Sequence, residues 1–166
     1  MPLDVLGGLV AFDDFLTVMG GLFKPADRFD EADRQRALKA VVFVFSADDE
    51  VSDKEVQLLH QKGNWMPAGT RAELDQLIDD VVAEVTGLDD ASRAEYAVAL
   101  AGEMSSDEAV RRETLIATAL AAAADLDGFL RQRAAHDHLA RLLDADVDEI
   151  DLEARDRLHL EEDEDD

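Results

Sequence analysis

The stretch LIATALAAAA, residues 115–124, decides the fold. It continues a helical pattern that begins near residue 106, it is apolar on every side, and most of its side chains are small. A helix of this kind is buried, and its small side chains let neighbouring helices approach closely. We therefore expect residues 106–124 to form the central helix of an all-α protein.

Helix-forming residues also dominate the rest of the chain, which has only three Pro and nine Gly. Apolar periodicity predicts about seven to eight helices in a single-domain bundle. The run Val41–Phe45 has the composition of a strand, but no turn separates it from the helical pattern that begins near Asp27. We assign it as the buried end of that helix. The other predicted helices cover residues 3–19, 70–86 and 91–103, a stretch from residue 52, a stretch with Leu130, Leu139, Leu142 and Leu143, and a stretch with Val147, Ile150, Ala154 and Leu158.

Three predicted helices share one type of start. Residues 52–55, 70–73 and 105–108 read Ser-Asp-Lys-Glu, Thr-Arg-Ala-Glu and Ser-Ser-Asp-Glu. In a capping box of this pattern the hydroxyl accepts from the third helical amide, and the Glu side chain accepts from the amide of the cap residue. We expect a helix to begin at each of these boxes.

Charge and composition limit the function. The chain of 166 residues has 40 Asp plus Glu against 16 Lys plus Arg, a formal net charge of −24, which disfavours binding to nucleic acid or to anionic membranes. No apolar run approaches the roughly 18 residues that span a bilayer. With no Cys there is no disulfide framework and no thiolate metal site. We expect one cytoplasmic domain over residues 1–160 and a disordered acidic tail over residues 161–166.

The acidic residues are mainly Asp, 26 against 14 Glu, and the chain has four Lys against twelve Arg. They are spread over every segment. This pattern suits a halophilic protein that stays soluble in concentrated salt, where repulsion between surface charges is screened. Most carboxylates are therefore expected to be solvated surface groups.

Two acidic turns each follow a buried helix. Asp48-Asp49-Glu50 comes after the first, and Asp125-Leu126-Asp127-Gly128 comes after the second. At an offset of 79 residues (127 − 48) Asp48 aligns with Asp127 and Val51 with Leu130. This correspondence indicates a weak internal duplication of a helix-turn-helix unit.

The two turns carry incomplete copies of one pattern: Ala-Asp-Gly, one residue, an aliphatic residue, three residues, Glu. The copies match at Ala47, Asp48, Val51 and Glu55, with Asp49 in place of Gly, and at Asp127, Gly128 and Leu130, with Ala134 in place of Glu. Over residues 38–143 the chain resembles TerB-like (tellurite-resistance type) proteins, a family similar also to the N-terminal domain of a membrane-anchored DnaJ-type co-chaperone. The resemblance implies about seven helices, no catalytic activity, a role in stress response, and acidic clusters that bind divalent cations.

Physical chemistry gives the first turn two interpretations. Three anions at a helix C-terminus cost roughly 0.3–1 kcal/mol each, and a bound Ca²⁺ or Mg²⁺ would reverse the sign of this interaction. Alternatively, Glu55 completes a capping box with Ser52, Asp49 takes the left-handed turn conformation, and the other acids are solvated. The candidate metal ligands are Asp48, Asp49, Glu50 and Glu55, with Asp125 and Asp127 as a second cluster.

Three further motifs favour structural roles. Asp144, Asp146 and Asp148 open like a calcium loop, but Glu149 and Arg155 stand where that loop needs Gly and Glu, so we expect a capped helix start. His136 and His138 lie on different faces of a helix and indicate a polar helix surface. We expect Trp65 to cover an edge of the core, although it could also anchor a partner.

The sequence therefore predicts a non-enzymatic TerB-like scaffold or adaptor for an unidentified protein partner, with a divalent cation bound at its acidic turns. The alternative is a plain protein-interaction module whose acids serve only solubility. Phosphate-binding and dinucleotide-binding glycine motifs, the Gly-x-Ser-x-Gly elbow and the His-Glu-x-x-His pair are absent from the sequence. A carboxylate-based hydrolase is disfavoured, because no acid-base pair stands out among the 40 acids.

Overall fold

The structure of the chain is a computed structural model. It describes residues 18–24, 28–48, 51–60, 65–104, 107–124 and 129–165. Within these ranges all regular elements are helical, which confirms the predicted all-α class. The elements are α3 (Glu31–Phe45), the short 3-10 helix η2 (Ser46–Asp48), α4 (Asp53–Leu59), α5 (Arg71–Val85), α6 (Asp90–Met104), α7 (Glu108–Ala124), α8 (Phe129–Leu142) and α9 (Val147–Asp165).

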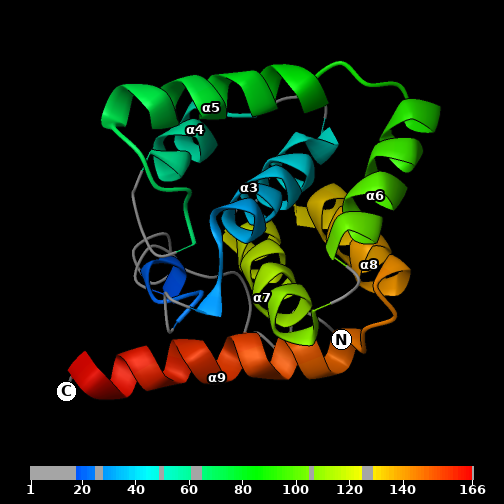
Figure 1. The fold of residues 1–166 in the computed structure, drawn as a ribbon. Helices are drawn as coiled ribbons and strands as arrows, with labels where there is room; N and C mark the ends of the chain where they lie inside the picture. Colours follow the sequence, from blue (N-terminus) through cyan, green and yellow to red (C-terminus); the bar gives the residue numbers. More distant parts are fainter. Residues whose placement is uncertain are drawn as a thin grey trace.

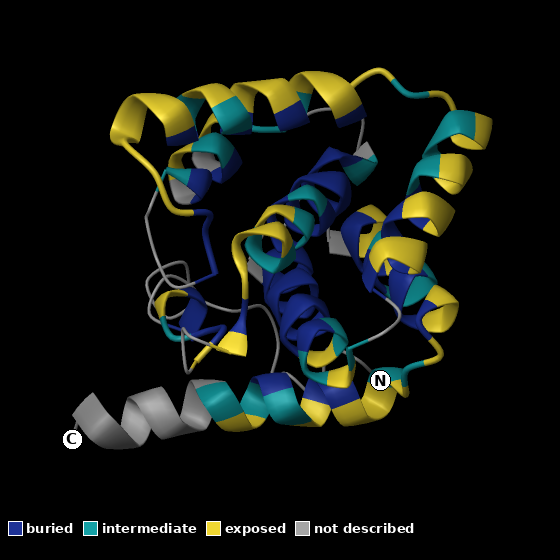
Figure 2. Ribbon diagram, viewed as in Figure 1, coloured by how far each residue is buried: buried dark blue, intermediate teal, exposed yellow. Residues whose placement is uncertain are grey.

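Helices α3 and α7 form the centre of the bundle and pack against each other (Figure 1). Every residue of α7 from Glu113 to Ala123 is buried, which confirms the predicted burial of the run from Leu115 as far as Ala123. The run Val41–Phe45 is helical and buried, so the helical assignment of this stretch is confirmed. Figure 2 shows the second half of α3 and most of α7 in the colour of buried residues, whereas the outer helices expose one side.

The outer helices surround this central pair. Helix α5 packs on α3, helix α6 packs on α3 and α8, and helix α9 packs on α7 at the opposite side of the bundle from α5 (Figure 1). Helix α8 contacts α3, η2 and α7. Among the described residues, no helix is long and apolar enough to cross a membrane.

The predicted duplication corresponds to α3 with α4 and to α7 with α8. The first helices of the two units are the central pair, but α4 has 7 residues and α8 has 14. The apolar face expected of α8 is partly wrong, because Leu130 is 80% exposed and Leu142 is 38% exposed. The buried positions of α8 are instead occupied by polar residues as well as by Leu139 and Ala140, and Leu143 is buried directly after the helix.

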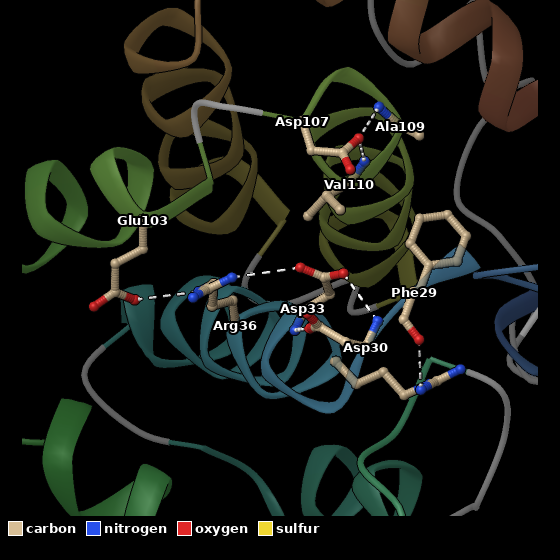
Figure 3. Close-up of polar contacts among 9 residues, drawn as sticks. Phe29, Asp30, Asp33, Arg36, Glu103, Asp107, Ala109 and Val110 are labelled. Carbon is tan, nitrogen blue, oxygen red and sulfur yellow. Dashed lines mark hydrogen bonds and ion pairs between the residues drawn. The ribbon is translucent and has the colours of Figure 1, made fainter. Parts of the chain in front are cut away.

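Helix starts agree with the capping predictions in part. The box at residues 52–55 is present, and Thr70 Oγ1 accepts from Glu73 N at 3.2 Å at the start of α5. The third box is wrong: Glu108 is the first helical residue of α7, and Asp107 is the cap that accepts from the amides of Ala109 and Val110 (Figure 3).

Helix α3 begins at Glu31, later than the predicted start near Asp27. Asp30 and Asp33 form a reciprocal capping box at its first turn, with nitrogen–oxygen distances of 2.8 and 3.0 Å (Figure 3). Because a carboxylate that accepts an orphan amide also complements the positive end of the helix, this box fixes the start at Glu31.

The two ends of the chain differ in how far the structure describes them. Most of the predicted helix over residues 3–19 lies outside the described residues, which include its last part, Val18 and Met19. Helix α9 starts after the cap Asp146, as predicted for the failed calcium loop. It continues to Asp165, into the segment for which the sequence predicts a disordered tail. Extending an existing helix adds one hydrogen bond per residue without a new nucleation step, which favours the continuation.

The close packing around α7 makes a first prediction. Replacing Ala122, which is fully buried, by Leu should lower the free energy of unfolding by about 1–3 kcal/mol, because the added atoms have no space. Ala83→Leu, at an exposed site of α5, is the matched control and should change stability by less than about 0.5 kcal/mol. Urea unfolding of both variants checks this, and equal stabilities would contradict the packing.

Candidate functional site

The buried side chains of Glu55 and Gln132 join helices α4 and α8 to each other and to the end of α3. Ser52 N donates to Glu55 Oε1 at 2.8 Å, and Gln132 Nε2 donates to Glu55 Oε2 at 2.7 Å. Gln132 Nε2 also donates to the carbonyl of Phe45 at 3.3 Å. The Glu55 residue is only 5% exposed, and both of its carboxylate oxygens accept hydrogen bonds from the protein.

The capping interpretation of Ser52 and Glu55 is confirmed, since Ser52 Oγ also accepts from Glu55 N at 3.2 Å. Gln132 lies in the first turn of α8, directly after the second acidic turn in the sequence. Its bonds to Glu55 and Phe45 therefore connect the start of α8 to α4 and to the end of α3. We call this group, Phe45, Ser52, Glu55 and Gln132, the turn junction.

The other predicted metal ligands are only partly covered by the structure. The backbone of Asp48 belongs to η2, whereas Asp49, Glu50, Asp125 and Asp127 lie outside the described residues. In the part of the chain that the structure describes, no three His, Cys, Asp or Glu side chains gather in a way that could hold a metal ion.

His136 is fully buried, so the predicted polar helix surface is wrong for this residue. Its Nδ1 lies 2.7 Å from Thr118 Oγ1, and the Thr118 hydroxyl donates its only proton to Leu115 O at 3.1 Å. Nε2, the other ring nitrogen of His136, is buried and has no hydrogen-bond partner among the described residues. Burial, and to a smaller extent the charge of Arg133, lowers the pKa of His136 to about 3.

A buried ion pair joins α8 to α9 beside this histidine. Arg133 Nη1 donates to Asp151 Oδ1 at 2.7 Å, and Nη2 donates to the other carboxylate oxygen. The side chains of Arg133 and Asp151 are 6% and 1% exposed. Arg133 Nε also lies 3.0 Å from Asp137 Oδ1, although burial keeps the pKa of Asp137 above its usual value.

Glu113 of α7 makes a second connection to α9. Its carboxylate accepts from both terminal nitrogens of Arg157 and, at 3.0 Å, from Phe23 N. Phe23 has φ of +61°, a strained value for a bulky residue. The bond to Glu113 and the burial of the ring against Phe29, with centroids 4.9 Å apart, hold it there.

A surface hollow of about 350 Å³ lies between α3, α6 and α8. Arg93, Arg131 and His138 line it together with a single acid, Asp90. The remaining lining is apolar: Phe43, Ala47, Ala94, Ala134 and Ala135. We call this feature the basic hollow.

Trp65, the other predicted contact for a partner, is 1% exposed and belongs to the core, as its structural interpretation predicts.

Comparison with protein-family models, with curated proteins and with solved structures finds no match. The arguments about function therefore rest on the chain itself.

Sequence reasoning missed Gln132, Arg133, Asp151 and Arg93. The sequence does hold a signal that two of them are buried. Arg133 shares a helical stripe with Ala140 and Leu143. Asp151 shares one with Val147 and Ala154.

The turn junction makes a second prediction. Glu55→Gln keeps the shape of the side chain but offers one acceptor oxygen instead of two, so either Ser52 N or Gln132 Nε2 loses its partner. An unpaired buried donor costs about 1–3 kcal/mol, and we expect the free energy of unfolding to fall by that amount. Denaturant unfolding checks this against Gln57→Glu, the opposite change at an exposed site of the same helix. Equal stabilities of the two variants would contradict the role of Glu55.

The buried neutral histidine makes a third prediction. An unfolded histidine has a pKa near 6.5, so between about pH 6.5 and pH 3 the unfolded chain binds a proton that the folded chain does not. The free energy of unfolding must therefore fall with decreasing pH, by up to about 1.4 kcal/mol per pH unit from this group. His136→Gln should lose about that much less stability than the wild type between pH 5.5 and 4.5.

Chemical unfolding at fixed salt and several pH values measures this difference. His138→Gln is the control, because His138 lies on the partly exposed side of the same helix. Parallel pH profiles for the wild type and His136→Gln would show that His136 is not held neutral.

Proposed function

We propose that this chain is a non-enzymatic scaffold or adaptor that binds a divalent cation, Ca²⁺ or Mg²⁺, at the end of the bundle where η2 meets α8. One observation carries the proposal: Gln132 donates to both Glu55 and the carbonyl of Phe45. This contact brings together the two sequence segments that lead into and out of the acidic turns.

The proposed ligands are the carboxylates of Asp48, Asp49 and Glu50, with those of Asp125 and Asp127. Asp48 belongs to η2, which contacts α8. Asp127 precedes α8 by only two residues, a length of chain that spans at most about 7 Å. Hard cations of this kind prefer carboxylate and carbonyl oxygens, and a cation also offsets the negative end of a helix. Glu55 then supports the site from within the core rather than as a surface ligand.

The non-enzymatic assignment is supported by how the buried polar groups are used. Glu55, Glu113 and Arg133 each bond to a group from another segment of the chain, so they hold elements together. The proposed setting is a cytoplasm with high salt, which suits the Asp-rich, Lys-poor surface. A role in stress response follows from the resemblance to TerB-like proteins alone.

A titration tests the cation site, our fourth prediction. Ca²⁺ or Mg²⁺ is added in 1 M KCl while amide chemical shifts are recorded. We expect saturable shifts at residues 46–56 and 124–132, and we expect Asp48→Ala to weaken binding at least tenfold, since hydrogen-bonded and coordinating charges contribute about 1.5–3 kcal/mol each.

Asp79→Ala is the matched control, because it removes the same charge from an exposed position of α5, far along the chain from both turns. It should leave the shifts unchanged. Diffuse shifts that do not saturate, or an equal loss in both variants, would refute the cation site and favour the plain interaction module.

A further inference from the structure

We propose that the basic hollow binds a small organic carboxylate, with the carboxylate held by Arg131 and Arg93 and a short hydrocarbon body on the alanine floor. The proposal does not depend on the cation site. It rests on the shape of the hollow, on one arginine fixed in place, and on a local reversal of the charge of the protein.

The shape follows from the sequence of α8. Arg131, Ala134, Ala135 and His138 are spaced by three, one and three residues, so they share one face of the helix. The two alanines leave room where larger side chains would fill the space between α8 and α6. The resulting volume of about 350 Å³ lies at the lower end of the range of small-molecule sites, which begins at about 300 Å³.

Arg93 is held in position by bonds to the C-terminal end of α3 and to Ser46. Its Nη1 donates to Ser46 Oγ at 2.8 Å and its Nη2 donates to Phe43 O at 3.0 Å. The guanidinium carbon lies 4.4 Å from the centroid of the Phe43 ring, and this ring stacks on Tyr96 at 5.8 Å. A guanidinium that is already ordered loses little conformational entropy when a ligand binds, which favours binding.

The charge of the hollow is opposite to that of the chain. Its lining contains two Arg and one His against one Asp, whereas the whole chain has 40 acids against 16 Lys plus Arg. An Arg offers a planar pair of donors that matches a carboxylate, and a His ring can donate from N–H in either protonation state. Because Nη1 and Nη2 of Arg93 already donate to Ser46 and Phe43, Arg93 acts on the ligand mainly through its charge. A carboxylate with an apolar body complements both parts of the lining. The carboxylate matches the Arg and His side chains, and the apolar body matches Phe43 and the alanines.

A purely structural role explains only part of this arrangement. Arg93 is a residue of α6, and its guanidinium contacts the C-terminal end of α3. A cation at this place complements the helix dipole and the last carbonyls. That role accounts for Arg93 and for Ser46. It does not account for the small side chains between Arg131 and His138, nor for the open volume above them.

Hexanoate is the probe for the test, our fifth prediction. It is titrated into the full chain in metal-depleted buffer with 1 M KCl, where the Debye length of about 3 Å screens the field of the distant acids. We expect saturable amide shifts at residues 43–47, 90–94 and 131–138. Hexanamide has the same body without the charge, and acetate has the charge without the body; both should bind at least tenfold more weakly.

Three variants assign the contacts. Arg131→Ala should weaken hexanoate binding about tenfold, as expected for the loss of a charge-assisted hydrogen bond. Ala134→Leu should abolish binding by filling the hollow while it leaves every charge in place. Arg141→Ala, an exposed arginine of the same helix outside the hollow, is the matched control and should bind like the wild type.

Far-UV circular dichroism and thermal unfolding establish that each variant is folded; Arg131→Gln and Ala134→Val replace any variant that is not. The proposal is refuted if hexanoate gives no saturable shifts, if hexanamide binds equally well, or if Arg131→Ala and Arg141→Ala bind alike. Because the buffer holds no divalent cation, failure of the cation site cannot produce any of these results.

Discussion

The surface of α7 is the constraint on which the rest of the structure depends. Its buried part includes five alanines with no exposed area (Ala117, Ala119, Ala121, Ala122 and Ala123), and it faces α3, α8 and α9. Helices that meet through such small side chains approach at the short end of the usual 8–10 Å range of axial distances. Larger core side chains come from Leu115, Ile116 and Leu120 of α7 and from its partners, and Val41–Phe45 of α3 provides many of them.

Packing on alanine holds helices close but orients them weakly, because dispersion has no preferred direction. The buried polar contacts supply direction. Glu55 with Gln132, Arg133 with Asp151, and Glu113 with Arg157 each join two different helices. A hydrogen bond has a defined length and angle, and its loss leaves a costly unpaired group in the core. These three contacts therefore fix the rotation of α8 and α9 relative to the central pair.

The same end of the bundle brings together both proposed ligand sites. Helix η2 contains Asp48, a proposed ligand of the cation, and Ala47, which lines the basic hollow. Helix α8 begins at the second acidic turn and carries Arg131 and His138 into the hollow. A scaffold that acts through this end would present a negative and a positive site next to each other, on a chain whose formal net charge is −24.

The sequence by itself determined the all-α class, the burial of residues 115–123 and of Val41–Phe45, and the capping box of Ser52 and Glu55, because these depend on local periodicity and local hydrogen bonds. It failed where polar residues occupy core positions. Nothing local shows that Gln132 reaches Glu55, 77 residues away, or that Arg93 reaches Ser46, 47 residues away. Only the tertiary structure decided these contacts, because burial of a polar side chain is stable only when a distant segment supplies its partner.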